Sequence, residues 1–318
     1  MTLLLILVGA LVKSTESGLS VPDWPTTYGK FMFAYPLNQM AGGIKYEHTH
    51  RMLASIVGLL TLILTLWLLR IKDLPVWIKR LSVFAFLTVV AQGILGGLTV
   101  KFFLPVWLSI FHGVLAQTFF LIVIFIAYAL SMEWRRRWNM EEESYNPRIL
   151  RLAIILMAMI YIQLIIGNIM RHTQSGLAVP DFPTMGWTFF PTFDQAWLNR
   201  INAWRFENNL DPVNMNQVGV HLLHRFWALL ILLKILWLNH IAYKECLDRP
   251  LILKTLYWIN TAVILQITLG ISTVLSHKEV YTTTMHVTMG AIVLGLSFLM
   301  VLRTSPLTWN QFIKRIGV

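Results

Sequence analysis

Long apolar segments recur along this chain, and most are long enough to cross a lipid bilayer as a helix. We read eight helices, at approximately 1–14, 49–70, 80–100, 105–131, 149–170, 220–243, 251–275 and 281–303. The first is shorter than the about 20 residues that a span needs. Only 13% of the residues are charged, whereas soluble domains carry about 25%. The sequence therefore predicts an all-α polytopic protein of the lipid bilayer with eight transmembrane helices.

The formal net charge of +11 raises the question of a nucleic-acid partner. The basic residues instead lie between the apolar segments, where they can face anionic lipid headgroups, so we expect no nucleic-acid binding. They gather in connections on one side of the eight-helix arrangement: Arg70, Lys72, Lys79 and Arg80; Arg135, Arg136, Arg137, Arg148 and Arg151; Lys244, Arg249 and Lys254; Lys314 and Arg315. The positive-inside rule predicts that this side, with both termini, faces the cytoplasm across an inner membrane.

An internal repeat organises the chain. SGLSVPDWPT at 17–26 matches SGLAVPDFPT at 175–184, an offset of 158. Further along, HTHRMLA at 48–54 matches LLHRFWA at 222–228, and the offset has become 174. The chain therefore reads as two tandem pseudo-symmetric four-helix bundles, 1–131 and 149–318, joined by a cytoplasmic linker at 132–148.

The second outer loop holds the extra residues of the repeat. Their apolar side chains recur with helical spacing at Phe193, Trp197, Ile201 and Trp204. This pattern predicts a short amphipathic helix at 193–204, either on the membrane surface or capping the bundle.

Four histidines survive the repeat as two pairs, each separated by 62 residues: His50 with His112, and His224 with His286. All four fall near the outer ends of helices, at similar depth. A lone membrane histidine often bonds a neighbouring helix, but two matched pairs favour a functional site. Two imidazoles facing each other across a four-helix bundle suit haem iron, whereas zinc takes more ligands and copper usually brings Met or Cys. We therefore predict one bis-histidine, non-covalent haem site in each half.

Other matched residues surround these histidines. Arg51 and Arg225 directly follow the first histidine of each pair, as candidate partners of haem propionates or as interfacial anchors. Gln92 with Gly96, and Gln266 with Gly270, occupy matched places on the third helix of each half. A glycine there admits either a flat macrocycle or a neighbouring helix.

One acidic residue breaks the symmetry. Glu47 stands three residues before His50, on the same helical face, and its counterpart in the second half is His221. A carboxylate one turn from a haem ligand can take a proton or stabilise a developing cation; the alternative is a boundary carboxylate paired with Lys45 or Arg51. His48 and His221 fit either spare ligands or hydrogen-bonding partners of the loops.

The ordered set of motifs resembles the haem A synthase family over nearly the whole chain. It comprises K-S-T-E-S-G-L-S-V-P-D-W-P at 13–25, E-x-x-H-R at 47–51, Q-G-I-L-G-G-L-T-V at 92–100, His112 and their second-half counterparts. Many bacterial relatives carry cysteines in the outer loops. Here those places hold Val21, Thr27, Val179 and Met185, and the one cysteine, Cys246, lies elsewhere.

The resemblance implies an enzyme that oxidises the C8 methyl group of haem O to a formyl group, giving haem A for cytochrome oxidase. It implies that His50 and His112 hold the substrate haem, that His224 and His286 hold a resident haem b, and that Glu47 is the essential carboxylate. A haem O synthase would deliver the substrate, and the electron acceptor is unidentified. Apolar outer faces fit a monomer or a small homo-oligomer equally well. The competing functions are a dihaem b-type electron carrier, which would not need Glu47, and a haem transporter.

Overall fold

The computed structural model describes residues 1–139 and 146–305. This part of the chain is helical and contains no β-strand, so the all-α prediction is confirmed. Its α-helices are α1 (Thr2–Ser14), α2 (Ile44–Arg70), α3 (Val76–Lys101), α4 (Val106–Ala129), α5 (Met132–Asn139), α6 (Pro147–His172), α7 (Gln195–Glu207), α8 (Met215–Glu245), α9 (Pro250–Leu275) and α10 (Val280–Thr304).

Seven of these helices, namely α2, α3, α4, α6, α8, α9 and α10, are long and apolar enough to cross a membrane. The chain is thus a multi-pass membrane protein. The remaining apolar helix, α1, has 13 residues. At 1.5 Å per residue it is ~20 Å long, less than the ~30 Å of a hydrocarbon core. Among the described residues there are therefore seven full-length candidate spans and one short apolar helix, where we predicted eight spans.

Two helices begin five residues earlier than predicted, and for α2 the change matters for the site. α2 begins at Ile44 rather than 49, so Glu47 and His48 belong to the helix that carries His50. α8 begins at Met215 rather than 220, because Asn214 and Gln217 form a reciprocal capping box there. His221, which the predicted helix at 220–243 already contained, lies in the second turn of α8, the helix that carries His224.

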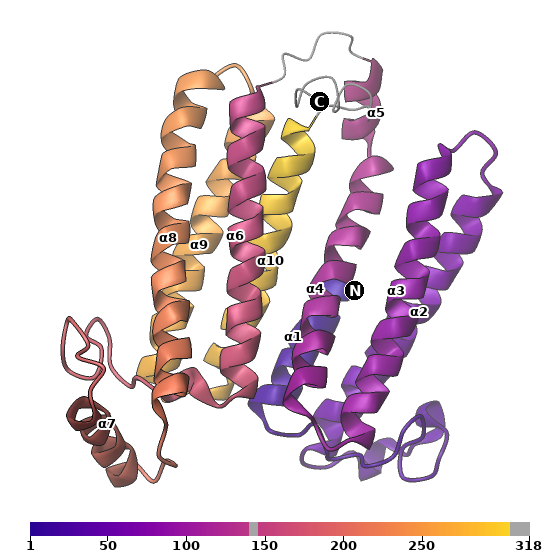
Figure 1. Cartoon of the computed structure of the whole chain (residues 1–318). Coiled ribbons are helices and arrows are strands. Elements are labelled where there is room, and N and C mark those ends of the chain that lie inside the picture. Colours follow the sequence, from indigo (N-terminus) through magenta and orange to yellow (C-terminus); the bar gives the residue numbers. More distant parts are fainter. Residues whose placement is uncertain (140–145, 306–318) are drawn as a thin grey trace.

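The long helices form two groups that lie side by side (Figure 1). In one group, α1 and α3 each contact both α2 and α4. In the other, α6 and α9 each contact both α8 and α10. Where the groups meet, α1 packs against α10, and α4 packs against α6 and α10. The histidine-bearing helices α2 and α4, like α8 and α10, are thus each flanked by the same two neighbours.

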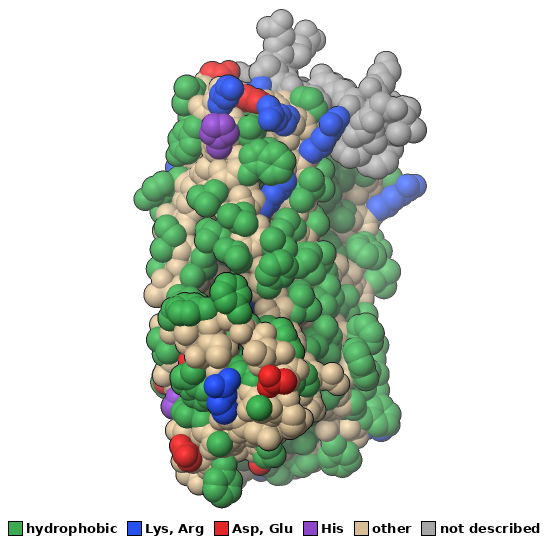
Figure 2. Space-filling model, turned by 60° about the vertical axis from the view of Figure 1, so that its left-hand side comes forward, with side chains coloured by type: hydrophobic (Ala, Val, Ile, Leu, Met, Phe, Trp, Pro, Cys, Tyr) green, Lys and Arg blue, Asp and Glu red, His purple; other side chains and the backbone are tan. Residues whose placement is uncertain are grey.

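The two ends of the molecule differ in character. The long loops and α7 lie at one end, and α5 lies at the other with the α2–α3 and α8–α9 connections (Figure 1). Figure 2 shows Lys and Arg side chains gathered at this second end above a broad hydrophobic surface. α5 occupies part of the predicted linker 132–148, which is therefore partly helical. The remainder of that linker at 140–145, and Lys314 and Arg315, lie outside the described residues.

The amphipathic helix predicted at 193–204 is α7, whose first turn is capped by the Asp194 side chain. Trp197 and Ile201 are fully buried against the second outer loop. Phe193 was wrongly placed on this face: it precedes the helix, in a left-handed backbone conformation, and is 55% exposed.

Candidate functional site

Each of the four matched histidines lies against a glycine of a flanking helix. His50 lies against Gly9 of α1, and His112 against Gly96 of α3. In the second group, His224 lies against Gly167 of α6, and His286 against Gly270 of α9. A β-carbon on any of these glycines would come within 2.8–3.2 Å of the imidazole Cε1 atom. Any larger residue would therefore force the ring to move.

The histidines of each pair face one another. The ring centroids of His224 and His286 are 6.4 Å apart, with 65° between the ring planes. His50 and His112 lie near one another. Two metal–imidazole bonds of ~2 Å, one to each ring, fit within the separation seen in the second pair. The structure therefore brings together each predicted pair.

Glutamines hold the fourth-helix histidine of each group. The Gln92 side-chain amide donates to the carbonyl of His112 at 2.9 Å, and the Gln266 amide nitrogen lies 3.5 Å from Nε2 of His286. The Nδ1 atoms of His50, His112 and His224 are buried and have no hydrogen-bond partner in the described part of the chain. Facing imidazoles seated on glycines, with buried nitrogens available, fit bis-histidine haem ligation.

Glu47 is part of a buried network that ties α2 to the first outer loop. Its side chain is nearly inaccessible, and Oε1 pairs with Nη2 of Arg51 at 2.6 Å. Oε2 accepts a hydrogen bond from the backbone N–H of Val21 at 2.8 Å. The sequence left Lys45 and Arg51 as possible partners of Glu47, and the structure shows the pair with Arg51.

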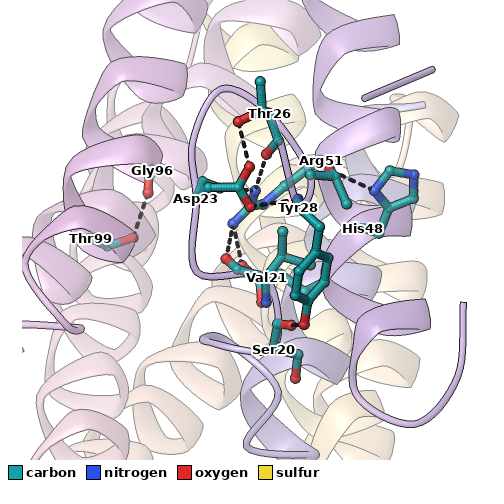
Figure 3. A network of polar contacts seen from close by, with 11 residues as sticks. Ser20, Val21, Asp23, Thr26, Tyr28, His48, Arg51, Gly96 and Thr99 are labelled. Atoms are coloured by element: carbon teal, nitrogen blue, oxygen red, sulfur yellow. Dashed lines mark hydrogen bonds and ion pairs between the residues drawn. The ribbon is translucent and has the colours of Figure 1, made fainter. Parts of the chain in front are cut away.

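Arg51 points into the first outer loop (Figure 3). Its guanidinium donates to the carbonyls of Val21 and Asp23, both at 2.6 Å, and of Thr26 at 3.1 Å. These contacts fix the loop over the helix. The expected pairing with a haem propionate stays a prediction for this residue.

The second half repeats this network with one exchange. Arg225 donates to the carbonyls of Val179, Asp181 and Thr184, the counterparts of the three carbonyls that Arg51 contacts. His221 takes the place of Glu47: its Nε2 accepts from Nε of Arg225 at 2.9 Å, and its Nδ1 donates to the carbonyl of Ser175 in the outer loop at 3.1 Å. The hydrogen-bond network between the helix and the outer loop is therefore similar in the two halves. It contains a carboxylate in the first half and an imidazole in the second.

Asp23 closes the loop beneath Arg51. Its carboxylate accepts from the N–H groups of Tyr28 and Gly29 at 2.7 and 2.9 Å, and from the hydroxyl of Thr26. Burial favours the neutral carboxyl, but these hydrogen bonds outweigh it and lower the pKa of Asp23 from 3.8 to about 2. Asp181 makes the same turn with Gly186, Trp187 and Thr184. Both aspartates thus close a turn of their outer loop.

His48 also serves the loop. Its Nδ1 lies 3.1 Å from the Thr27 hydroxyl, and its ring packs on Tyr35. His48 and His221 are thus both hydrogen-bonding partners of the loops. Sequence analysis missed the roles of Gly9 and Gly167, although both stand in aligned segments of the repeat, 158 residues apart.

The chain also resembles proteins of known family. Residues 1–298 match the family COX15-CtaA, described as cytochrome oxidase assembly protein. The Heme A synthase of Pelagibacter ubique is 25% identical, covering 95% of this chain and 93% of its own length. That of Lysinibacillus sphaericus is 23% identical over 98% and 94%, and that of Rickettsia bellii 26% identical over 90% of both.

Proposed function

Because this chain belongs to the COX15-CtaA family of cytochrome oxidase assembly proteins, we propose that it is a haem A synthase, which oxidises the C8 methyl group of haem O to a formyl group. The observation that supports this best is the asymmetry between two otherwise matched sites. Glu47 adds a buried carboxylate beside His50, and neutral His221 replaces it beside His224. A dihaem electron carrier gives no reason for that exchange.

In this proposal each half is a four-helix bundle with its own haem site. Residues 1–131 hold the substrate, haem O, between His50 and His112, and residues 149–318 hold a resident haem b between His224 and His286. The proposal counts α1 as the eighth membrane helix. The long-loop end faces outward from the inner membrane, and the basic end and both termini face the cytoplasm, in accordance with the positive-inside rule. Haem b at His224 and His286 supplies one-electron transfer.

Glu47 is the proposed catalytic residue. Conversion of a methyl group and water to a formyl group releases four protons and four electrons, so the site needs a proton acceptor and the protein needs an electron acceptor. The Arg51 guanidinium and the Val21 N–H fix the two oxygens of Glu47 one turn from His50, where the carboxylate can take a proton or stabilise positive charge. Arg51 and Arg225 remain the candidate partners of the haem propionates. An upstream haem O synthase supplies the substrate. The apolar outer faces of the helices are compatible with a homo-oligomer.

Pigment analysis tests the activity directly. Co-expression with a haem O synthase, followed by extraction and chromatography, should yield haem A or hydroxylated haem O. Membranes that contain the protein and haem O but neither product would overturn the proposal and leave the dihaem carrier. Separately, His224→Ala and His286→Ala should each abolish the low-spin signal of the resident haem b. An unchanged spectrum in both would show that the two halves are assigned the wrong way round.

A further inference from the structure

A groove runs along the lipid-facing side of the first helical group, between α2 and α3. It has a volume of about 320 Å³ and is lined by apolar side chains and by two glycines, Gly58 and Gly93. A β-carbon on either glycine would meet no atom within 4 Å. The groove is therefore made by missing side chains, and it opens toward the membrane past Leu59 and Ile94, which are 57% and 51% exposed.

The groove begins beside the proposed substrate site. Ala54, in its lining, is one helical turn beyond His50 on α2. Gly93 is one turn from Gly96, the glycine against which His112 lies. α2 and α3 are packed neighbours, and the lining on both runs from this depth toward the middle of the bilayer. From Ala54 to Leu62 the groove follows α2 for ~12 Å.

The second half carries large side chains at the matching positions. At the repeat offset of 174, Leu232 replaces Gly58 and Ile267 replaces Gly93. Ile267 packs against the hydrophobic core formed by α6, α8, α9 and α10. Two large apolar side chains thus occupy, in the half proposed to keep haem b, the positions left open in the half proposed to take haem O.

We propose that this groove binds the isoprenoid tail of haem O and so selects the substrate at the first site. The inference rests on the proposed function. Haem O and haem B share a macrocycle and differ in the long apolar tail that replaces a vinyl group of haem B. A site for the tailed molecule needs an apolar channel that leaves the ligand pair, and a site for haem B does not. The groove supplies such a channel in the first half, whereas the matching positions of the second half carry Leu232 and Ile267.

Ser55 supports the same assignment. It lies at the outer part of the groove, where its hydroxyl donates to the Arg51 carbonyl at 3.0 Å, and its counterpart in the second half is Leu229. The tail of haem O carries a hydroxyl at the carbon next to the macrocycle. The oxygen of Ser55 keeps the capacity to accept a hydrogen bond from it.

The test compares the binding of two haems to the full-length protein, purified from cells that lack haem O synthase and titrated in detergent. The double variant Gly58→Leu/Gly93→Ile, which introduces the side chains of the second half, should bind haem O ~10-fold more weakly, a factor within the usual cost of overpacking an apolar site. Its affinity for haem B at the first site should stay within about twofold of wild type. Gly219→Leu is the matched control, because Gly219 also borders open space but lies on α8, away from the groove.

Each other outcome contradicts the inference. If the double variant binds haem O as wild type does, the tail does not use the groove. Equal loss of both haems would indicate general damage to the site, and wild-type protein that does not prefer haem O over haem B would exclude tail selection. Loss of co-purified phospholipid with unchanged haem O binding would assign the groove to a lipid chain. Because the readout is binding, a failure to make haem A would count against the proposed function and leave this comparison intact.

Discussion

Glu47 and His221 show how one structural role accommodates two chemistries. Both side chains accept hydrogen bonds from an arginine one turn further along the helix, and both hydrogen-bond to the backbone of the outer loop, Glu47 at the Val21 N–H and His221 at the Ser175 carbonyl. A buried ion pair contributes little net stability against its desolvation cost, and a neutral replacement is often tolerated. Retention of a carboxylate in one half alone therefore points to a requirement beyond folding.

This exchange provides a substitution that separates chemistry from structure. Glu47→His should keep the loop tie, because Arg225 is held by three carbonyls and an imidazole in the second half. Both haem sites should still load, whereas haem A formation should fall at least ~100-fold, the scale of a lost acid–base group. Turnover is measured by chromatography of extracted pigments, and loading by the haem-to-protein ratio.

The reciprocal change is the control. His221→Glu restores the acid in the second half and should leave haem A formation close to wild type. Glu47→Gln, which keeps an acceptor for Arg51 but loses the charge, should behave as Glu47→His does. Full turnover in both Glu47 variants would remove this carboxylate from the mechanism.

At the residue scale, the sequence was most informative where side chains carry a chemical signature. The two histidine pairs and Glu47 next to Arg51 were identified from the repeat, and the structure brings each of these groups together. The carbonyls of Val21, Asp23 and Thr26 that bind Arg51 were not foreseen, because backbone acceptors are the same in every residue and only the folded loop gathers them.

At the scale of helices, the site depends on four glycines that let the flanking helices approach the imidazoles. Gly9→Ala would place a methyl group 2.8 Å from Cε1 of His50, and Gly270→Ala 2.9 Å from Cε1 of His286. Overpacking of this kind costs about 1–3 kcal/mol. We expect each variant to weaken haem binding in its own half, measured as faster loss of haem to excess apomyoglobin.

The specificity of this effect is checked on a glycine with free space. Gly219→Ala, where a β-carbon would meet nothing within 4 Å, should lose haem at the wild-type rate. If Gly9→Ala affected both halves equally, the glycine contacts would matter for folding and not for one haem pocket.

Helix positions were predicted well by hydropathy and helix ends less well. The first turns of α2 have the sequence I-K-Y-E-H-T, and those of α8 begin M-N-Q-V-G. Because these polar residues lower the local hydropathy, the apolar segment starts later than the helix itself. The capping box at Asn214 is a local signal that identifies the true start of α8. α5 was missed because its charged sequence has no apolar period long enough to register.

At the scale of the whole molecule, the two halves are joined through α1. Arg171, near the end of α6, donates from Nη2 to the Ala10 carbonyl at 2.6 Å and to the Ser14 hydroxyl at 2.9 Å. Ser14 is also contacted by the hydroxyl of Thr284 on α10. A cation at the C-terminal end of α1 additionally complements the helix dipole. The short helix α1 thus belongs to the interface between the halves and, through Gly9, also contacts His50 of the proposed first haem site.

The repeat supplies a matched pair of residues that tests this connection. Lys13 is the counterpart of Arg171, at the offset of 158, but it forms a surface ion pair with Glu16, which is 66% exposed. Arg171→Gln removes charge-assisted hydrogen bonds between the halves and should lower the free energy of unfolding by about 1.5–3 kcal/mol. Lys13→Gln should change it by no more than ~1 kcal/mol, because exposed ion pairs contribute little.

Denaturant unfolding followed by the absorbance of both haems measures the difference. Equal effects of the two substitutions would mean that the contact between Arg171 and α1 does not stabilise the association of the halves, and that apolar packing of α1 against α10 and of α4 against α6 holds them together.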